Sequence, residues 1–422
     1  MGFARFSAST GRFGSLRQSA FAGIAPSRMA LFGREGVILA GQANRAGDPR
    51  FPTNPEILLD AAVTRGTLSG GLSKRQVLAK GMAGGSGTGL GQAIVTALAA
   101  NSAGDAAAVV SAPVAGKRKG SVAGYRSRLF VRRRGQPSFR RILDIGRRTV
   151  GHSPAALAVN ALGDVLVASD DRESVRARLV RANGKLDGEQ RLGEGGSSLG
   201  GERLVAAMDG TRRMLVAWMA QSSGETDAGG PGIVALAYAP PYKPFRAAQV
   251  VQRNLPRGYL RGISGKAVQA ALLRNRGVVV WTGFAGGRYA VRTVDVTQGR
   301  ASAPRDLAPS GASAQLRGLA VGPRGGTVVA CASGAVRKIA LPKPPLTLQA
   351  MARAADATAW GPVENVATTD TGAQDFMASD ALIAADPVSG QSVLLWSDPL
   401  PAGANPLPPS PVPVKYSVRP PG

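Results

Sequence analysis

Apolar and polar positions follow one pattern that recurs seven times along the chain. In each copy an apolar, alternating segment leads to a short turn containing Gly, Asn or Asp, and then to a run of small or β-branched apolar residues. The runs cover residues 37–41, 107–111, 165–169, 214–218, 278–281, 327–331 and 392–396. Because Gly, Asn and Asp accept the positive φ that tight turns require, each copy predicts a β-hairpin.

Further strands are predicted on both sides of these runs. Partner strands precede the turns, most clearly at residues 155–160, 204–208, 268–273, 316–321 and 381–385. More polar alternating segments follow, such as 129–133, 175–180 and 289–295, and they suit outer strands with one packed face and one wet face. Segment 92–100 is rich in Ala and favours a helix by propensity, but its place in the repeat is that of an inner strand.

Two inner and two outer strands make a four-stranded unit, and seven such units predict an all-β chain folded as a β-propeller. The number of blades falls to six if one terminal unit is partial. The alternative architecture is a β-sandwich array. A chain of 422 residues is long for one ordinary core, and a repeat architecture allows a single core to keep growing.

Composition divides the chain into four parts. Residues 1–28 form a basic lead-in, disordered or similar to a targeting segment, although a misassigned start is equally open and no clear signal peptide is present. Residues 29–398 hold the repeats. The Pro-rich segment 399–413 is stiff and unsuited to a central strand. Residues 414–422 form a short strand and tail, and we hypothesise that this strand closes the ring by pairing with the first unit.

The repeated units resemble the diverged four-stranded blades of sialidase-like propellers and of long propellers in secreted bacterial proteins, over about residues 29–419. The chain departs from these families, since it has neither the Ser-x-Asp-x-Gly-x-Thr-Trp box of sialidases nor the Gly-His and Trp-Asp pairs of the best-known seven-bladed repeats. The resemblance implies a propeller fold and, if the start is misassigned, a location outside the cell or in the cell envelope.

Positive charge is the strongest local signal. The net charge is +26, which suits binding to an anionic polymer but also fits the Arg-rich composition of a GC-rich genome. Segment 117–148 has twelve basic residues and one acid, Asp144. In a strand over 125–134, alternation places Arg126, Arg128, Arg132 and Arg134 on one face with Phe130. The candidate polyanion-binding residues are Arg126, Arg128, Arg132, Arg133, Arg134, Arg140 and Arg141. The alternative is a solvated outer strand whose charge prevents edge pairing.

Groups for catalysis and metal binding are scarce. The chain has one His, His152, and one Cys, Cys331, so a hydrolytic triad lacks its usual base and a zinc site lacks ligands. No cofactor is predicted. The stretch 84–91 is rich in Gly but lacks the Lys of a phosphate-binding loop, which favours a flexible connection.

A glycosidase would need paired carboxylates. Acidic residues cluster at Asp370, Asp375, Asp380 and Asp386, and at Asp170, Asp171 and Glu173. Loop acids of this kind are expected to cap turns or pair with Arg.

Large residues recur at the end of the repeated run and form a predicted structural column of Trp218, Trp281, Cys331 and Trp396. Equivalent positions of inner strands meet in the core, where aromatic side chains bury the most area. These residues are therefore interpreted as packing residues and not as a stacking platform for a ligand.

The first functional hypothesis is a binding or scaffold propeller without enzymatic activity, a monomer whose partner is an anionic polymer or a protein not yet identified. The alternatives are polyanion binding through segment 117–148 and a glycan-active hydrolase of sialidase-like type. No apolar stretch is long enough to cross a membrane as a helix, so no integral membrane segment is predicted.

Overall fold

The computed structural model describes residues 2–3, 6–7, 12–13, 17–18, 24–32, 36–44, 59–67, 73–82, 91–118, 121–148, 154–171, 173–196, 203–221, 232–256, 266–273, 276–307, 312–322, 325–336, 342–369, 382–385, 392–397 and 414–419. All regular secondary structure in these ranges is β-strand, as the alternating pattern predicts. The chain divides into two compact units. The first comprises Met1–Ser7, Arg12–Ser198 and Ala206–Met214, and the second comprises Ala8–Gly11, Leu199–Val205 and Leu215–Gly422.

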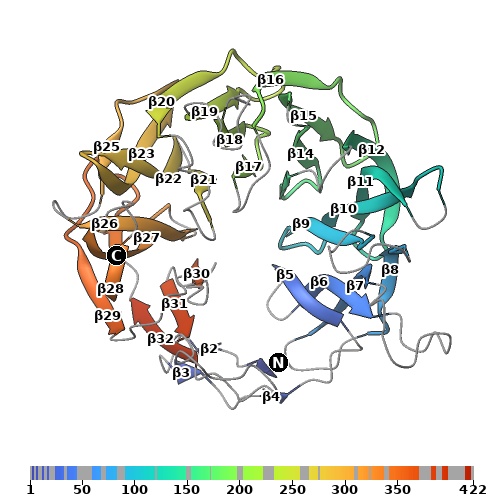
Figure 1. Ribbon diagram of the computed structural model, residues 1–422, viewed down its shortest axis with the longest axis horizontal. Helices are drawn as coiled ribbons and strands as arrows, with labels where there is room; N and C mark the ends of the chain where they lie inside the picture. Colours follow the sequence, from blue (N-terminus) through green and yellow to red (C-terminus); the bar gives the residue numbers. More distant parts are fainter. Residues whose placement is uncertain are drawn as a thin grey trace. The chain divides into compact units, whose positions relative to one another are not determined.

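The first unit contains three antiparallel four-stranded sheets, each with its strands in chain order (Figure 1). Their strands are β5 (Ile24–Phe32), β6 (Gly36–Asn44), β7 (Leu59–Thr67) and β8 (Gln76–Ala79); β9 (Ile94–Ala100), β10 (Ala106–Ala115), β11 (Val122–Arg132) and β12 (Arg140–Arg148); and β13 (Ala155–Val159), β14 (Val165–Asp170), β15 (Ser174–Val180) and β16 (Gln190–Glu194). Two short pairs precede them, β1 (Gly2–Phe3) with β4 (Arg17–Gln18) and β2 (Phe6–Ser7) with β3 (Arg12–Phe13).

The remaining strands form four further antiparallel sheets, of four, five, four and three described strands. Their strands are β17 (Leu204–Met208), β18 (Met214–Gln221), β19 (Gly232–Ala239) and β20 (Gln249–Leu255); β21 (Val268–Leu272), β22 (Gly277–Ala285) and β23 (Arg288–Thr297), with β24 (Arg300–Ala301) and β25 (Arg305–Asp306) both paired to β23; β26 (Ser313–Val321), β27 (Thr327–Val336), β28 (Pro342–Arg353) and β29 (Glu364–Thr369); and β30 (Leu382–Ala385), β31 (Ser392–Ser397) and β32 (Val414–Arg419).

All seven predicted apolar runs lie in the second strand of a sheet, where the hairpin pattern places them. Burial follows the predicted division into inner and outer strands: every residue of β14 is buried, whereas in β16 only Leu192 is buried and Arg191 and Glu194 are exposed. Ala-rich segment 92–100 forms strand β9, as its place in the repeat predicts and against its helix propensity. Pairing with β10 and packing in the core outweigh the small intrinsic preference of Ala for helix.

Three pairs of neighbouring sheets pack against each other through apolar side chains. In the first unit, one core cluster joins Ile38 and Val63 of the first sheet to Ala108 and Val110 of the second. Another joins the second sheet to the third, and in the second unit a third cluster joins the β21–β25 sheet to the β26–β29 sheet. Up-and-down four-stranded sheets that pack in chain order through their faces are the blades of a β-propeller.

Two boundaries differ from expectation. Strand β5 starts at Ile24, so the first sheet begins before the predicted limit at residue 29. Strand β32 pairs with β31, with Leu394 opposite Ser417, and is therefore the third strand of the last sheet. The hypothesis that this segment also pairs with the first repeated unit stays a prediction.

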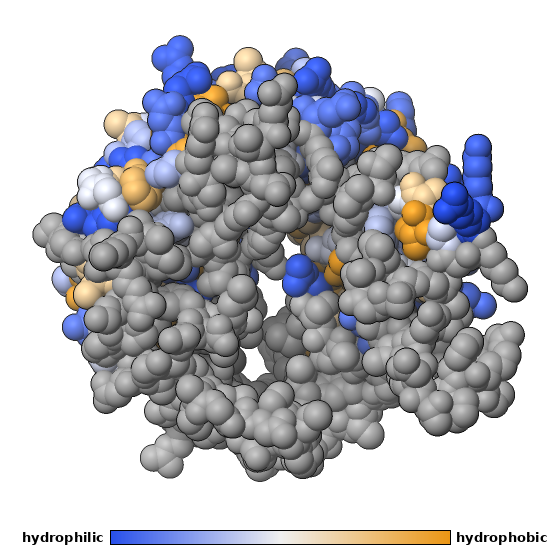
Figure 2. All heavy atoms as spheres, in the orientation of Figure 1, coloured by the Kyte–Doolittle hydropathy of each residue, from blue (hydrophilic) through white to orange (hydrophobic). Residues whose placement is uncertain are grey.

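Exposed apolar side chains are few among the large residues of the described part of the chain. On the face drawn in Figure 2, hydrophilic side chains predominate among the coloured residues. The large exposed apolar side chains come from separate strands and turns; they are Val77, Ile142, Leu162, Leu186 and Tyr242. Singly exposed apolar residues are normal in soluble proteins, so charge offers a better guide to a binding surface than apolarity does.

Candidate functional site

Strands β11 and β12 are the outer half of the second sheet and carry seven arginines with one acid, Asp144. They pair antiparallel, and the register shifts between Ser127 and Arg128 and again between Leu129 and Phe130. The first shift sets Asp144 opposite Arg128. Irregularities of this kind re-aim side chains at a sheet edge, and here they place the acid among the basic residues.

Three guanidinium groups surround the carboxylate of Asp144. Arg141 Nη2 lies 2.8 Å from Oδ1, Arg128 Nε lies 3.6 Å from Oδ1, and Arg126 Nη1 lies 3.9 Å from Oδ2. The side chains are 51%, 28% and 38% exposed, and that of Asp144 is 39% exposed. We call these four residues the outer arginine cluster. One carboxylate neutralises one of three cations, so the cluster keeps a positive surplus that solvent can reach.

The backbone register adds to this charge. Position 147 of β12, an arginine, pairs directly with Arg126, and position 148, also an arginine, pairs with Tyr125. Like charges on directly opposed positions destabilise a sheet slightly.

Arg132 lies on the predicted face, but its side chain is buried and contacts main-chain carbonyls. Its Nε donates to Gln136 O at 2.9 Å and its Nη1 donates to Gly104 O at 2.7 Å. Its guanidinium carbon lies 5.8 Å from the centre of the Phe32 ring. Burial, together with the charge of Arg65, lowers the pKa of Arg132 from its ordinary value.

Arg133 also binds main-chain carbonyls, donating to Gly163 O through Nη1 and to Arg181 O through Nη2 at 2.8 Å. Arg134 lies beyond the end of β11 in a turn, where its main-chain N–H donates to Asp105 at 2.9 Å and its side chain is exposed. Arg140 is exposed as well. Only some of the candidate polyanion-binding residues therefore face solvent.

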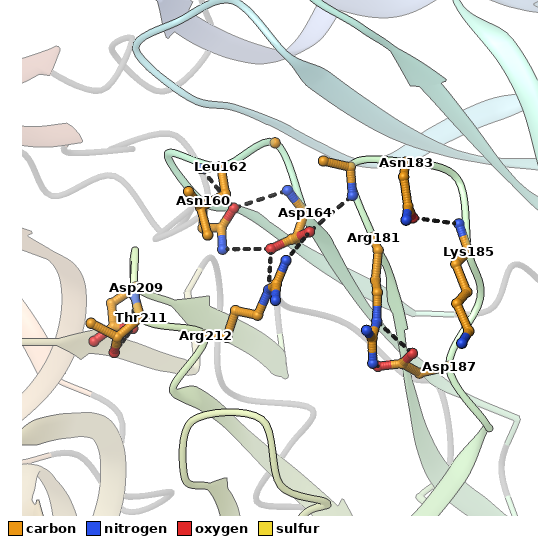
Figure 3. A network of polar contacts seen from close by, with 12 residues as sticks. Asn160, Leu162, Asp164, Arg181, Asn183, Lys185, Asp187, Asp209, Thr211 and Arg212 are labelled. Carbon is orange, nitrogen blue, oxygen red and sulfur yellow. Dashed lines mark hydrogen bonds and ion pairs between the residues drawn. The ribbon is translucent and has the colours of Figure 1, made fainter.

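A polar network between sheets was not predicted from the sequence. In the turn between β13 and β14, Asn160 Nδ2 donates to Asp164 Oδ2 at 3.1 Å, and Ala182 N donates to Asp164 Oδ1 at 2.9 Å (Figure 3). Arg212, 48 residues further on, donates to the same carboxylate through Nε at 2.6 Å and Nη2 at 3.2 Å. Burial by itself raises the pKa of Asp164, but these hydrogen bonds, led by the one from Arg212, hold it below its ordinary value.

The second sheet repeats this turn. Asn101 Nδ2 donates to Asp105 Oδ2 at 3.0 Å and also to Asn160 O, in the next sheet, at 2.7 Å. Gly104 and Gly163 adopt φ values of 95° and 84°, which favour Gly. The pattern Asn-x-x-Gly-Asp occurs at both 101–105 and 160–164 and is the sequence signal that could have predicted these turns. In the structure, these turns connect the two neighbouring sheets through the hydrogen bond from Asn101 to Asn160.

The predicted column is buried where its side chains are described. Trp218, Trp281 and Cys331 have almost no exposed surface, and Trp281 Nε1 donates to Gln252 Oε1 at 2.7 Å. Burial raises the pKa of the Cys331 thiol to about 12. Trp396 lies in β31, but its side chain is outside the described residues.

Several predicted positions lie outside the described residues: His152, the Gly-rich residues 84–90, and Asp370, Asp375, Asp380 and Asp386. Of the other acids, Asp171 caps a turn by accepting from the N–H groups of Glu173 and Ser174 at 3.1 and 2.8 Å. Within the described part of the chain, no group of His, Cys, Asp and Glu could hold a metal ion, and no helix is long and apolar enough to cross a membrane.

The sheets define an all-β protein of the β-propeller class. No protein-family model matches the chain, and no curated protein matches it. Among solved structures, the phage phi92 endosialidase is 8% identical with a TM-score of 0.44, over 94% of this chain and 67% of that one. An ulvan lyase is 10% identical with a TM-score of 0.40, over 89% and 80%. A protein of unknown function from Dyadobacter fermentans is 12% identical with a TM-score of 0.36, over 78% and 93%.

Proposed function

We propose that this protein is a non-enzymatic binding propeller that binds an anionic polymer through the outer arginine cluster. The observation that supports this function is the charge on β11 and β12, where three partly exposed arginines share one carboxylate. Arginine presents planar donors that match phosphate, sulfate and carboxylate groups, and a row of such groups on a strand suits a repeating anion.

The position of the cluster supports binding from solution. β12 is the outermost described strand of its sheet and runs for nine residues, compared with four in β8 and five in β16. A long outer strand with many charges resists pairing with a second copy of itself, because the charges repel. The same charges attract a partner of opposite sign over a distance of about 8 to 10 Å at physiological salt.

The test is binding of the purified chain to heparin and to duplex DNA across a salt series. The variant carries Arg126→Ala, Arg128→Ala and Arg141→Ala. We expect its affinity to fall and its salt slope to decrease by about 2 to 3, since each lost phosphate contact removes about 0.9 from the slope for duplex DNA. Arg132 and Arg133 are left intact because they hold main-chain carbonyls, and their loss would disturb the fold.

The matched control removes three exposed arginines outside the cluster, Arg191, Arg253 and Arg300. Both variants lose the same net charge. If the control loses as much affinity as the cluster variant, binding depends on net charge and the outer arginine cluster is not a site.

A glycan-active hydrolase stays a prediction, since it needs two carboxylates that face one cavity. A location outside the cell or in the cell envelope also stays a prediction.

A further inference from the structure

A second arginine cluster lies in the second unit around Asp295 of β23. Arg353 Nη1 lies 2.9 Å from each carboxylate oxygen of Asp295. Arg305 Nη2 lies 3.7 Å from Oδ2, and Arg276 Nε lies 3.9 Å from Oδ1. We call these four residues the Asp295 cluster. It holds three cations and one anion, so it carries a positive surplus, as the outer arginine cluster does, but in a buried setting.

Two of these arginines are held in place by the turn at 354–361. Arg276 Nη2 donates to Ala355 O at 2.9 Å and to Ala357 O at 2.8 Å, and Arg305 Nη1 donates to Thr358 O at 3.1 Å. The cluster is therefore preorganised by main-chain contacts. A site whose cations are already in position loses less conformational entropy when an anion binds.

The hydrogen bonding of Arg353 is incomplete. Its side chain is fully buried, and its guanidinium lies 4.6 Å from the centre of the Trp360 ring. Within the described residues, its Nε and Nη2 have no hydrogen-bond partner, and neither has Trp360 Nε1. Buried donors without acceptors are rare and costly in folded proteins. Asp295 Oδ1, an acceptor, also has no hydrogen-bond partner among the described residues. Three of these four atoms are donors, so most of what is missing is an acceptor, and the surplus of positive charge favours an anion.

The second sheet provides an internal comparison, because Arg132 occupies the corresponding position. Arg132 and Arg353 each end the third strand of a sheet and pair with the first residue of the second strand, Ala106 and Thr327. The Nε and Nη1 of Arg132 both donate to main-chain carbonyls. A buried arginine at this position of a sheet can therefore have its Nε satisfied by main-chain carbonyls, whereas the Nε of Arg353 is left without a partner among the described residues.

We propose that the Asp295 cluster binds a tetrahedral oxyanion, such as phosphate or sulfate, with Arg353 as the buried anchor. Solvent reaches the Asp295 cluster at Arg305, whose side chain is 50% exposed. Burial lowers the pKa of Arg353, as expected for a cation whose charge is incompletely balanced. This site lies on other strands than the outer arginine cluster, and it does not depend on the function proposed for that surface.

Isothermal titration calorimetry with inorganic phosphate on the full chain, at constant ionic strength, tests the proposal. We expect one saturable site in the unaltered protein. Arg305→Gln should weaken binding about tenfold, the lower end for loss of a charge-assisted hydrogen bond, because Arg305 is half exposed. Asp295→Asn should tighten binding, since it removes the carboxylate that competes for the three arginines. Arg300→Gln, an exposed arginine on β24 of the same sheet, is the matched control and should change nothing.

Tryptophan fluorescence provides a second readout at the site itself. Phosphate should change the emission of the unaltered protein, and the change should be absent in Trp360→Phe. If the unaltered protein shows no saturable binding, or if Arg305→Gln binds phosphate as tightly as Arg300→Gln, the proposal is wrong. Should Asp295→Asn fail to fold, the comparison of the two arginine variants still decides the matter.

Discussion

Replacing Asp164 by Asn should destabilise the first unit more than any exposed ion pair can. The carboxylate is fully buried and accepts two hydrogen bonds from Arg212, which is itself 20% exposed. Removing one partner of a buried pair costs about 3 to 5 kcal/mol. Because solvent partly reaches Arg212, we expect the lower value, about 3 kcal/mol, or a fall in Tm of about 10 °C for a cooperative unit of this size.

Thermal melts and hydrogen exchange together measure this effect. The Ala182 amide donates to Asp164, so its protection should fall along with the Tm. The matched control is Asp187→Asn, which breaks the partly exposed pair with Arg181 and should cost less than about 1 kcal/mol. If both variants change stability equally, the buried carboxylate does not hold the third sheet to Arg212 and the reasoning fails.

Acidification provides a further check on Asp164. Its folded pKa lies below the ordinary value of 3.8, so ionisation stabilises the folded state at any pH above about 3.8. That contribution is lost as the pH falls below 3.8 and through the folded pKa. The difference in stability between the unaltered protein and Asp164→Asn should therefore be constant near neutral pH and shrink in acid. A difference that grows in acid would contradict the assignment.

Three further predictions concern single positions. Gly163→Ala should destabilise the protein more than Gly135→Ala: both have positive φ, but a Cβ at 163 would lie 3.0 Å from a carboxylate oxygen, whereas the space at 135 is open, as thermal melts of both variants would show. Cys331 should not react with a thiol reagent under native conditions at pH 8, because it is buried and its pKa is about 12, and it should react once the chain is unfolded by denaturant. Arg132→Met should cost about 2 kcal/mol or more by leaving two carbonyls without donors, whereas Arg134→Ala should stay within about 0.5 kcal/mol in urea unfolding.

The sequence by itself determined where the second strand of each sheet lies. Period-two alternation and turns of Gly, Asn and Asp act over a few residues, so they are legible without knowledge of the fold. All seven second strands, and the strand at β9 in place of a helix, follow from them. The local pattern also identified β11 as an outer strand rich in arginine.

Tertiary structure decided which of these arginines face solvent. Alternation places Arg126, Arg128 and Arg132 on one face, but that face meets the first sheet near the end of β11, where Phe130 joins the core and Arg132 is buried. The local sequence pattern does not predict the register shift that brings Asp144 opposite Arg128. The ion pair of Asp164 with Arg212 and the cluster at Asp295 join residues 48 and 58 positions apart. Contacts between sheets depend on how blades pack, and no short window of sequence contains that information.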